Sequence, residues 1–535
     1  MSVITPHRPQ VRPGRDGFAQ LVRAEWTKFR TVRGWVIGTV VGALLIIGLA
    51  ALTGANSHCN FAPATPQNPN PAPMPCPAPP TGPDGEWVSD SFYFVHQPLA
   101  GNGSITVRVT SLTGRYSAQG AKGAAGSPLA GMKSGVQPWS KAGIMIKAST
   151  KEGSAYAAMM ITGRHGVRMQ WNFTHDTAGL AGKVSATSPR WLRLTRSGDV
   201  ISGYDSVDGK KWTLVGTATL TGLPATVRAG LFAATPGYTV NSTSLGGSSS
   251  HGGPALATAA IDRVSHQGTW PAGRWTGGPV GGRIDVALPP SAQGFTQAGG
   301  RFTVSGSGDI APDTAADAGR NVQQALAGVF IGLIAMVVVG AMFMTTEYRR
   351  GLIRTTFTAS PRRGRVLAAK AVVLGGVMFA AGLIAVAIAI PLGEHLLHAN
   401  GNPIFSLPAL TLLRITVGTA ALLAVAAVLA LAVGALLRRS AGAVTAVIAG
   451  IVLPYLLAVL SGVLPLGAEE WLVRVTPAAA FAIMQSAPAY SQVDATYAPA
   501  DGYFPLPPWA GFAVLCAWAA LALALATYVL RRRDA

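Results

Sequence analysis

Six uninterrupted apolar runs divide this chain of 535 residues, and each is about as long as a membrane-crossing helix. A helix rises about 1.5 Å per residue, so about 20 apolar residues cross a hydrocarbon core of roughly 30 Å. The pattern therefore predicts six transmembrane helices, at residues 35–53, 325–345, 371–392, 415–437, 441–464 and 509–530. A cleaved signal peptide is the alternative for the first run, but its length and the long basic leader before it favour a retained span.

Between the first two spans the pattern changes to short stretches in which apolar and polar residues alternate. Examples are SITVRV at 104–109 and GVRMQWNF at 166–173. Alternation with a period of two predicts strands, and turn residues recur every ten residues or so without intervening helices. This pattern predicts an all-β sandwich or jelly roll, preceded by a Pro-rich tether at 54–84. The Gly/Ser-rich piece at 241–254 is expected to be a loop or linker.

Charge then gives the expected orientation. The chain is 49% hydrophobic and carries a formal net charge of +20, which on its own would suggest nucleic-acid binding. Of its 42 Lys and Arg residues, however, 19 lie in four short segments beside the apolar runs, at 1–34, 347–370, 438–439 and 531–533. Short basic loops stay on the cytoplasmic side of a membrane. We therefore expect both termini and the 345–370 segment to be cytoplasmic, the 54–324 segment to be extracellular, and no nucleic-acid partner.

The three cysteines add little constraint. Cys59 and Cys76 lie in the Pro-rich tether on the expected oxidising side, so a disulfide and two free thiols are both open alternatives. Cys516 lies within the last span.

Two basic segments carry a family resemblance. They read LVRAEWTKFRTVRGW at 21–35 and TTEYRRGLIRTTFTASPRRGRVLAAK at 345–370. Together with the six spans, they resemble the N-terminal interfacial segment and the loop after the second span of ABC-2 type transporter permeases. The resemblance implies a cytoplasmic surface that meets a separate ABC ATPase dimer, which would use ATP and Mg²⁺, and a second permease copy around one pathway. The implied coupling residues are Glu25, Trp26, Lys28, Arg30, Glu347, Tyr348, Arg349, Arg350 and Arg354.

A second resemblance concerns the β segment. The stretches SDSFYFVHQPLAGNGSITVRVTSL, PWSKAGIMIKAS and WLRLTRSGDVISGYDSVDGKKWTLVG resemble concanavalin-like (laminin-G/glucanase-type) jelly rolls over residues 85–270. FTVSGSGDI at 302–310 resembles the stretch that normally precedes such a domain, which leaves open whether this later segment completes the sandwich. Aromatic rings can stack on sugars, so Trp139, Trp171 and Tyr204 are candidate glycan contacts, although core packing is the usual role of strand aromatics. Trp139 has the best prospect of exposure.

The expected protein is thus an α-helical polytopic membrane protein with six transmembrane helices and an inserted all-β jelly-roll sandwich. Its parts are a cytoplasmic amphipathic segment (1–34), the first span (35–53), the tether (54–84), the sandwich (85–270), a Gly-rich segment with candidate extra strands (271–324), and a permease core (325–535) with a coupling loop (346–370). It would lie in the cytoplasmic membrane of a bacterium, contact lipid, and export an amphiphilic, lipid-like, antibiotic or cell-wall-related substrate.

The sequence evidence for a nucleotide site, a metal site or an enzymatic activity in this chain is weaker. GSPLAGMKS at 126–134 lacks the adjacent Gly-Lys-Ser of a phosphate loop, so the chain needs no cofactor of its own. His395 and His398 have a spacing that can bind zinc, but they lie at a span end, where polar side chains are expected. Lys370 and Arg414 are also interpreted as span-end residues that extend their charge to the interface. A membrane anchor that binds wall glycan without transport is the alternative function, and a glucanase would need paired acidic residues in one groove.

Overall fold

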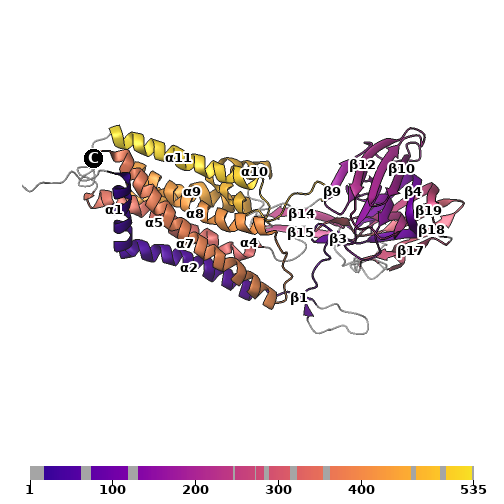
Figure 1. Cartoon of the computed structure of the whole chain (residues 1–535), viewed down its shortest axis with the longest axis horizontal. Helices are drawn as coiled ribbons and strands as arrows, with labels where there is room; N and C mark the ends of the chain where they lie inside the picture. Colours follow the sequence, from indigo (N-terminus) through magenta and orange to yellow (C-terminus); the bar gives the residue numbers. More distant parts are fainter. Residues whose placement is uncertain are drawn as a thin grey trace, which may run out of the picture. The chain divides into compact units, whose positions relative to one another are not determined.

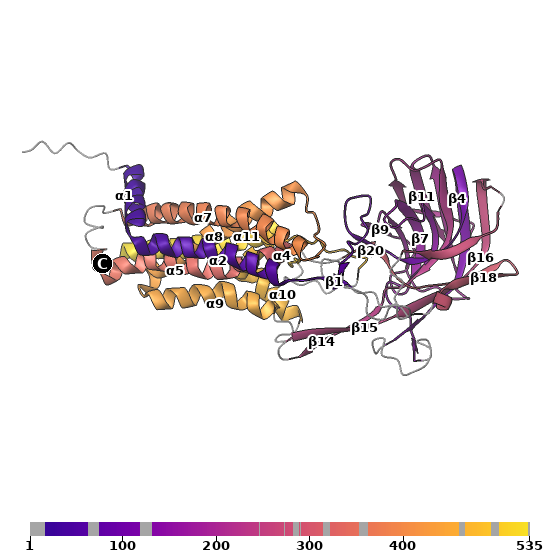
Figure 2. The same cartoon turned by 90° about the horizontal axis from the view of Figure 1, so that it is seen from below.

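A computed structural model describes residues 17–61, 74–117, 131–244, 247–271, 273–281, 288, 290–313, 322–352, 362–459, 466–493 and 502–532. Within these residues, six helices are long and apolar enough to cross a membrane, which confirms the six predicted spans. They are α2 (Arg33–Asn56), α4 with α5 (Val322–Ala325 and Ala327–Arg349), α7 (Arg363–Ala399), α8 (Ala409–Leu437), α9 (Ser440–Val459) and α11 (Pro508–Arg532). Figures 1 and 2 show these helices running side by side as one bundle, with the short helix α1 (Phe18–Thr31) across one end of it.

Small residues set the closest helix contacts. A Cβ added at Gly328 of α5 would lie 2.4 Å from the carbonyl oxygen of Ile46 in α2, and one at Gly340 would lie 2.4 Å from the carbonyl oxygen of Ala427 in α8. Only glycine permits backbones to approach this closely, and such small-residue contacts are typical of membrane helix packing. The α5 helix is therefore held tightly between α2 and α8.

The connection between α9 and α11 differs from the expected loop. It contains α10 (Leu466–Val475) and a 3₁₀ helix, η2 (Pro477–Met484), in which all eight residues are buried against the bundle. The run of small and apolar residues PAAAFAIM allows this segment to be buried, although it is too short to be recognised as a span.

The strands after residue 76 form a separate compact unit, the β unit. Its main sheet is antiparallel, with strand order β12-β11-β10-β4-β13-β6-β7-β8-β9, and β5, β16, β17, β18 and β19 are joined alongside. The bounds are β4 Phe92–Tyr116, β5 Lys133–Ser134, β6 Lys141–Lys147, β7 Tyr156–Thr162, β8 Val167–Trp171, β9 His175–Ala178, β10 Arg190–Ser197, β11 Val200–Ser206, β12 Thr213–Thr219, β13 Thr226–Ala234, β16 Ala255–Thr269, β17 Thr276–Val280, β18 Gly294–Ala298 and β19 Arg301–Gly306.

The long strand β4 joins the two layers of the sandwich. Its first part, Tyr93–Ala100, pairs with β13, and its second part, Gly103–Val109, pairs with β10. Gly101, between the two parts, has a φ of +65°, a conformation that favours glycine. Alternate residues on both sides of this point face one core, which also takes in apolar side chains of β6, β7, β10 and β13. These contacts confirm the predicted sandwich.

Segments after residue 270 complete the sandwich, which the sequence left open. Strand β19 pairs with β16, and β20 (Ile310–Pro312) pairs with β3 (Val88–Asp90). Two ion pairs with fully buried lysines hold these late strands and β3 against β6, Lys141–Asp309 and Lys147–Asp90, each at 2.7 Å. The β unit therefore continues past the expected boundary to Pro312. The Gly/Ser-rich piece also differs from the expected linker, because β14 (Tyr238–Ser244) and β15 (Gly247–Gly253) form an antiparallel hairpin.

Candidate functional site

The amphipathic helix α1 has a buried side and an exposed side. Glu25 and Phe29, one turn apart, are both only 3% exposed, whereas Trp26 and Arg30 are exposed. Residues four apart share one side of a helix, so a carboxylate and a ring are pressed together against the bundle. A buried carboxylate needs a cation, and the structure supplies two.

A cluster of four charged side chains joins α1 to α5 and α7. Lys370 Nζ of α7 lies 2.7 Å from Glu25 Oε2 and 2.6 Å from Glu347 Oε1 of α5. Lys28 Nζ lies 2.9 Å from Glu25 Oε1 and 3.2 Å from the same oxygen of Glu347. We call these four residues the ion cluster. Two carboxylates and two ammonium groups give it zero net charge, and Lys370 is fully buried at its centre.

Aromatic rings enclose the ion cluster on its inner side. Lys370 Nζ lies 4.7 Å from the centroid of the Phe343 ring, within the range of a cation–π contact. Phe343 in turn packs edge-on against Trp35 at 4.8 Å and against Phe29 at 5.7 Å between centroids. These rings exclude water, so the charges of the ion cluster interact more strongly than they would at a surface.

The electrostatics of Lys28 reflect this arrangement. Partial burial acts to lower its pKa, but the hydrogen bond and charge of Glu25, together with those of Glu347, outweigh burial and raise the pKa above its ordinary value. Lys28 therefore stays charged at physiological pH and keeps the ion cluster neutral.

The other predicted coupling residues that the structure describes are not members of the ion cluster. Tyr348 is half-buried, with the guanidinium of Arg438 at 5.2 Å from its ring centroid. Arg349 and Arg350 are exposed at the end of α5, and Arg354 lies outside the described residues. This end of the bundle thus presents several cations around a buried neutral centre.

Lys370 is the member of the ion cluster that the sequence interpretation missed. It was expected to extend its charge to the interface, and this is wrong, because its side chain is fully buried between two carboxylates. Helix α7 begins at Arg363, so Lys370 lies two turns inside it and shares a face with the buried Val366, Leu367 and Leu374. The available signal was a lysine on such an apolar face, in a chain whose coupling residues already included two glutamates.

At the opposite end of α7, the two cysteines whose state the sequence left open form a disulfide. Cys59 and Cys76 are bonded, and β1 (Asn60–Phe61) pairs with β2 (Met74–Pro75) between them. The backbone N–H of Cys59 donates to the carbonyl of Asn400 at 3.1 Å, and that of Cys76 donates to Gly401 at 3.0 Å. The side chain of Asn402 adds a hydrogen bond to the Ser57 carbonyl at 2.6 Å. The disulfide hairpin is therefore attached to the end of α7.

The three candidate glycan contacts lie apart from one another in the β unit. Trp139 is only 2% exposed and stacks under His165 at 4.0 Å between centroids, so the expectation that it is exposed is wrong. Trp171 is half-buried and stacks on His175 at 4.9 Å. Tyr204 is half-buried on β11, directly opposite Arg193 of β10.

Comparison with known proteins identifies the family. The model of a family described as "ABC-2 family transporter protein" matches residues 233–535. The chain belongs to this family. This ABC-2 protein is therefore the membrane subunit of an ABC transporter, a transport subunit that is not itself an enzyme, and membership of the family implies pairing with an ABC ATPase subunit. The match favours transport over the alternative of a membrane anchor.

Similarities to solved structures cover only parts of this ABC-2 protein. A functionally unknown protein from Saccharomyces cerevisiae is 18% identical, with 34% of this chain and 76% of that chain covered and a TM-score of 0.20. A lectin from Bauhinia forficata in complex with GalNAc is 11% identical, with 36% and 87% covered and a TM-score of 0.19. Scores this low carry no argument about function. No curated protein matches the sequence.

Proposed function

We propose that this protein is the permease subunit of an ABC exporter in the cytoplasmic membrane of a bacterium. A separate ATPase dimer would bind ATP and Mg²⁺ and drive it, and a second permease copy would complete the pathway. The cargo would be amphiphilic, lipid-like, antibiotic or cell-wall-related. The observation that carries the proposal is the ion cluster, which fastens a peripheral helix to two spans at the end of the bundle where basic residues gather.

Charge distribution supports a cytoplasmic location for that end. Arg363 Nη1 donates to the carbonyl of Leu530 at 2.7 Å, which brings the start of α7 and the end of α11 together. Arg438, between α8 and α9, lies against Tyr348 at the end of α5. The basic segments from distant parts of the chain thus meet at one end of the bundle, as expected for the cytoplasmic side.

The ion cluster gives a route for mechanical work. A partner that pushes on the exposed side of α1 would meet Trp26 and Arg30, while Glu25 on the buried side is bonded to Lys370. Because Lys370 also binds Glu347, a displacement of α1 would act on α5 and α7 together. Buried charge pairs resist separation, since each charge left alone in an apolar site is costly.

The apolar character of the spans supports the proposed cargo class. All six have high mean hydropathy, between 1.9 and 2.7, and the charged side chains of the ion cluster lie at a bundle end. A pathway walled by such helices suits a molecule with a substantial apolar part, because it offers few partners to a fully polar one.

Sidedness and partnership can be tested in intact cells and in purified protein. A variant with Cys516→Ser as background would carry a single new cysteine, either Arg350→Cys at the α1 end or His398→Cys at the disulfide end. Both positions are exposed. A membrane-impermeant maleimide is expected to label the variant at 398 in intact cells, and the variant at 350 only after the cells are opened.

Purification in mild detergent is expected to recover an ATP-hydrolysing subunit with the permease. The double charge reversal Arg349→Glu/Arg350→Glu is expected to release this subunit while leaving the melting temperature of the permease unchanged. Labelling of position 350 from outside intact cells, or purification without any ATPase subunit, would contradict the proposal.

A further inference from the structure

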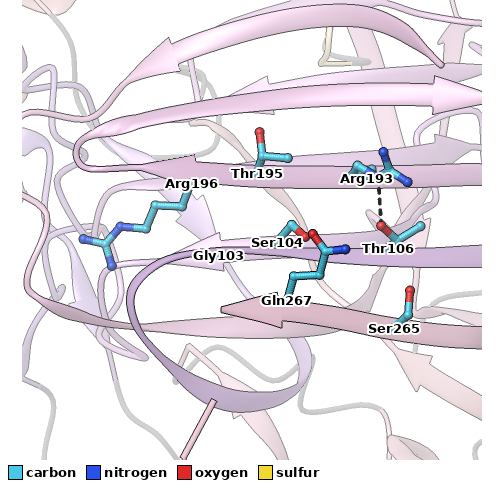
Figure 3. A pocket seen from close by; sticks show the side chains of 8 residues that line it. All are labelled: Gly103, Ser104, Thr106, Arg193, Thr195, Arg196, Ser265 and Gln267. Carbon is cyan, nitrogen blue, oxygen red and sulfur yellow. Dashed lines mark hydrogen bonds between the residues drawn. The ribbon is translucent and has the colours of Figure 1, made fainter. Parts of the chain in front are cut away.

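A polar groove lies on the outer face of the β unit, on the opposite side of the sheet from the core. It has a volume of about 340 Å³ and is formed by β4, β10 and β16. Figure 3 shows the side chains of Arg193, Thr106 and Ser265 as one row across the three strands, and those of Thr195, Ser104 and Gln267 as the next. The register agrees, because Thr106 pairs with both Arg193 and Ser265, and Ser104 pairs with both Thr195 and Gln267.

The groove is rich in hydroxyl groups and positively charged. Four of the lining residues named above carry hydroxyls, Gln267 carries an amide, and none of the described lining residues is acidic. Strand outer faces are often polar, so hydroxyls alone would mean little. Here, however, Ser104 and Thr106 are only 9% and 8% exposed, which places their polar groups at the bottom of a depression.

Arg193 is held in place above this floor. Its Nε donates to Thr106 Oγ1 at 3.0 Å, and its guanidinium lies 3.9 Å from the centroid of the Trp212 ring. These two contacts fix the orientation of the guanidinium. The hydrogen bond to Thr106 uses Nε, and the two terminal nitrogens, Nη1 and Nη2, lie on the other side of the group. A guanidinium fixed in this way is suited to bidentate recognition of a carboxylate or phosphate.

The other arginine at the groove has a different role. Arg196 is 6% exposed, and its guanidinium donates to the carbonyls of Gly198, Pro224 and Ala225 at 2.9, 2.7 and 3.3 Å. It closes one end of the groove by tying two loops together. The nearest carboxylate on β16, Asp262, is bonded to Arg108 at 2.7 Å and so does not neutralise Arg193.

We propose that this groove binds a short stretch of an acidic saccharide. Arg193 would hold the acidic group, carboxylate or phosphate, and the Ser, Thr and Gln side chains would hydrogen-bond the sugar hydroxyls. Tyr204, which lies beside Arg193 in the register of β10 and β11, offers a ring on which a sugar can pack. The volume lies at the low end of the range for small-molecule sites, about 300–1,000 Å³, and is suited to one or two sugar units.

Calorimetric titration of the full-length protein tests the proposal. The protein is placed in nanodiscs of phosphatidylcholine, because maltoside detergents would themselves present sugars. The probes are trigalacturonic acid, the neutral galactose trisaccharide and a phosphorylated galactose trisaccharide. Wild type is expected to bind at least one of the two acidic probes about tenfold or more tightly than the neutral one. The acidic probe preferred then shows whether carboxylate or phosphate is the natural group.

Three variants locate the site. Arg193→Gln is expected to remove the preference for acidic probes, and Thr195→Leu to abolish binding of all probes by filling the groove. Lys210→Gln removes an exposed cation of the same β unit outside the groove and is expected to bind as wild type does. Melting temperatures confirm that each variant is folded. Absence of binding by wild type, equal binding of neutral and acidic probes, or unchanged binding by both groove variants would overturn the proposal.

Discussion

Removal of the Lys370 charge is the most direct test of the ion cluster. In wild type, two carboxylates and two ammonium groups sum to zero; Lys370→Met leaves two carboxylates and the ammonium of Lys28, a net charge of −1. Lys28 is 38% exposed on its side chain and lies 2.9 and 3.2 Å from the two glutamates, so it screens them only in part. Breaking a buried ion pair by removing one partner typically costs about 3–5 kcal/mol, and we expect a loss in that range.

The double variant Lys370→Met/Glu347→Gln separates charge balance from packing. It restores the net charge to zero, because one carboxylate and one ammonium group are left. We therefore expect it to be more stable than Lys370→Met alone, although it lacks one more native group. Residues in contact commonly show coupling of about 0.5–3 kcal/mol in such cycles.

The assay is the thermal unfolding midpoint of the detergent-solubilised protein, measured for wild type, both single variants and the double variant. Arg365→Met is the matched control, since it removes an exposed cation from the same helix and should leave the midpoint near that of wild type. If Lys370→Met unfolds at the same temperature as the control, the ion cluster is not a buried neutral unit. If the double variant is destabilised by the full sum of the single effects, charge balance is not the reason for its stability.

Three further predictions concern other parts of the chain. Gly328→Ala should lower the unfolding midpoint, because its Cβ would lie 2.4 Å from a carbonyl oxygen of α2, whereas Gly376→Ala, with nothing within 4 Å, should not. The double variant Cys59→Ser/Cys76→Ser should lose about 3 kcal/mol of stability, and reductant should bring wild type to the same midpoint. Burial raises the pKa of Glu86 from 4.5 to about 7. Its contribution to stability should therefore be greatest below pH 4.5 and be lost as pH rises through 7, by about 1–2 kcal/mol, and Glu86→Gln should remove this dependence from the melting curve.

The hydrophobic pattern was sufficient for the spans, because a helix in lipid needs an uninterrupted apolar run. It was also sufficient for most strands, because a strand with one buried face alternates apolar and polar residues. It was insufficient for the 3₁₀ segment Pro477–Met484, which is buried by the surrounding helices and is too short to satisfy a span criterion. The late strands β19 and β20 were uncertain for a similar reason. They pair with β16 and β3, and this pairing depends on the tertiary fold. Alternation within a strand does not show which other strand it pairs with.

In the ion cluster, too, the local sequence does not show which tertiary partners a side chain will have. The resemblance to ABC-2 permeases drew attention to Glu25, Lys28 and Glu347, but not to Lys370, which joins them from a position 345 residues after Glu25. A lysine near a span end is usually extended to water, and only the packing of α1 over this end decides otherwise. Trp139 is a second case in which burial was not predicted. Its local sequence is typical of a loop, yet the side chain is buried under His165.

Helices α2 and α7 are connected at both of their ends. At one end, Glu25 of α1, which leads directly into α2, binds Lys370 of α7 at 2.7 Å. At the other end, Asn400 after α7 donates from Nδ2 to the carbonyl of Gly54 in α2 at 2.9 Å, next to the disulfide hairpin. Two helices fixed to each other at both ends, and packed along their length, are expected to move as one body.

Spin labels can test whether α2 and α7 move together. Leu44 on α2 and Ile384 on α7 are 60% and 61% exposed, so cysteine-linked labels there should not disturb packing. We expect the distance between these labels to be the same in nucleotide-free and ATP-bound complexes with the ATPase. A second pair, Leu44 with Leu525 on α11, checks that the ATP-bound sample has changed conformation. If the first distance changes while the ion cluster is intact, α1 does not transmit force to α2 and α7 as a unit, and the coupling route must lie elsewhere.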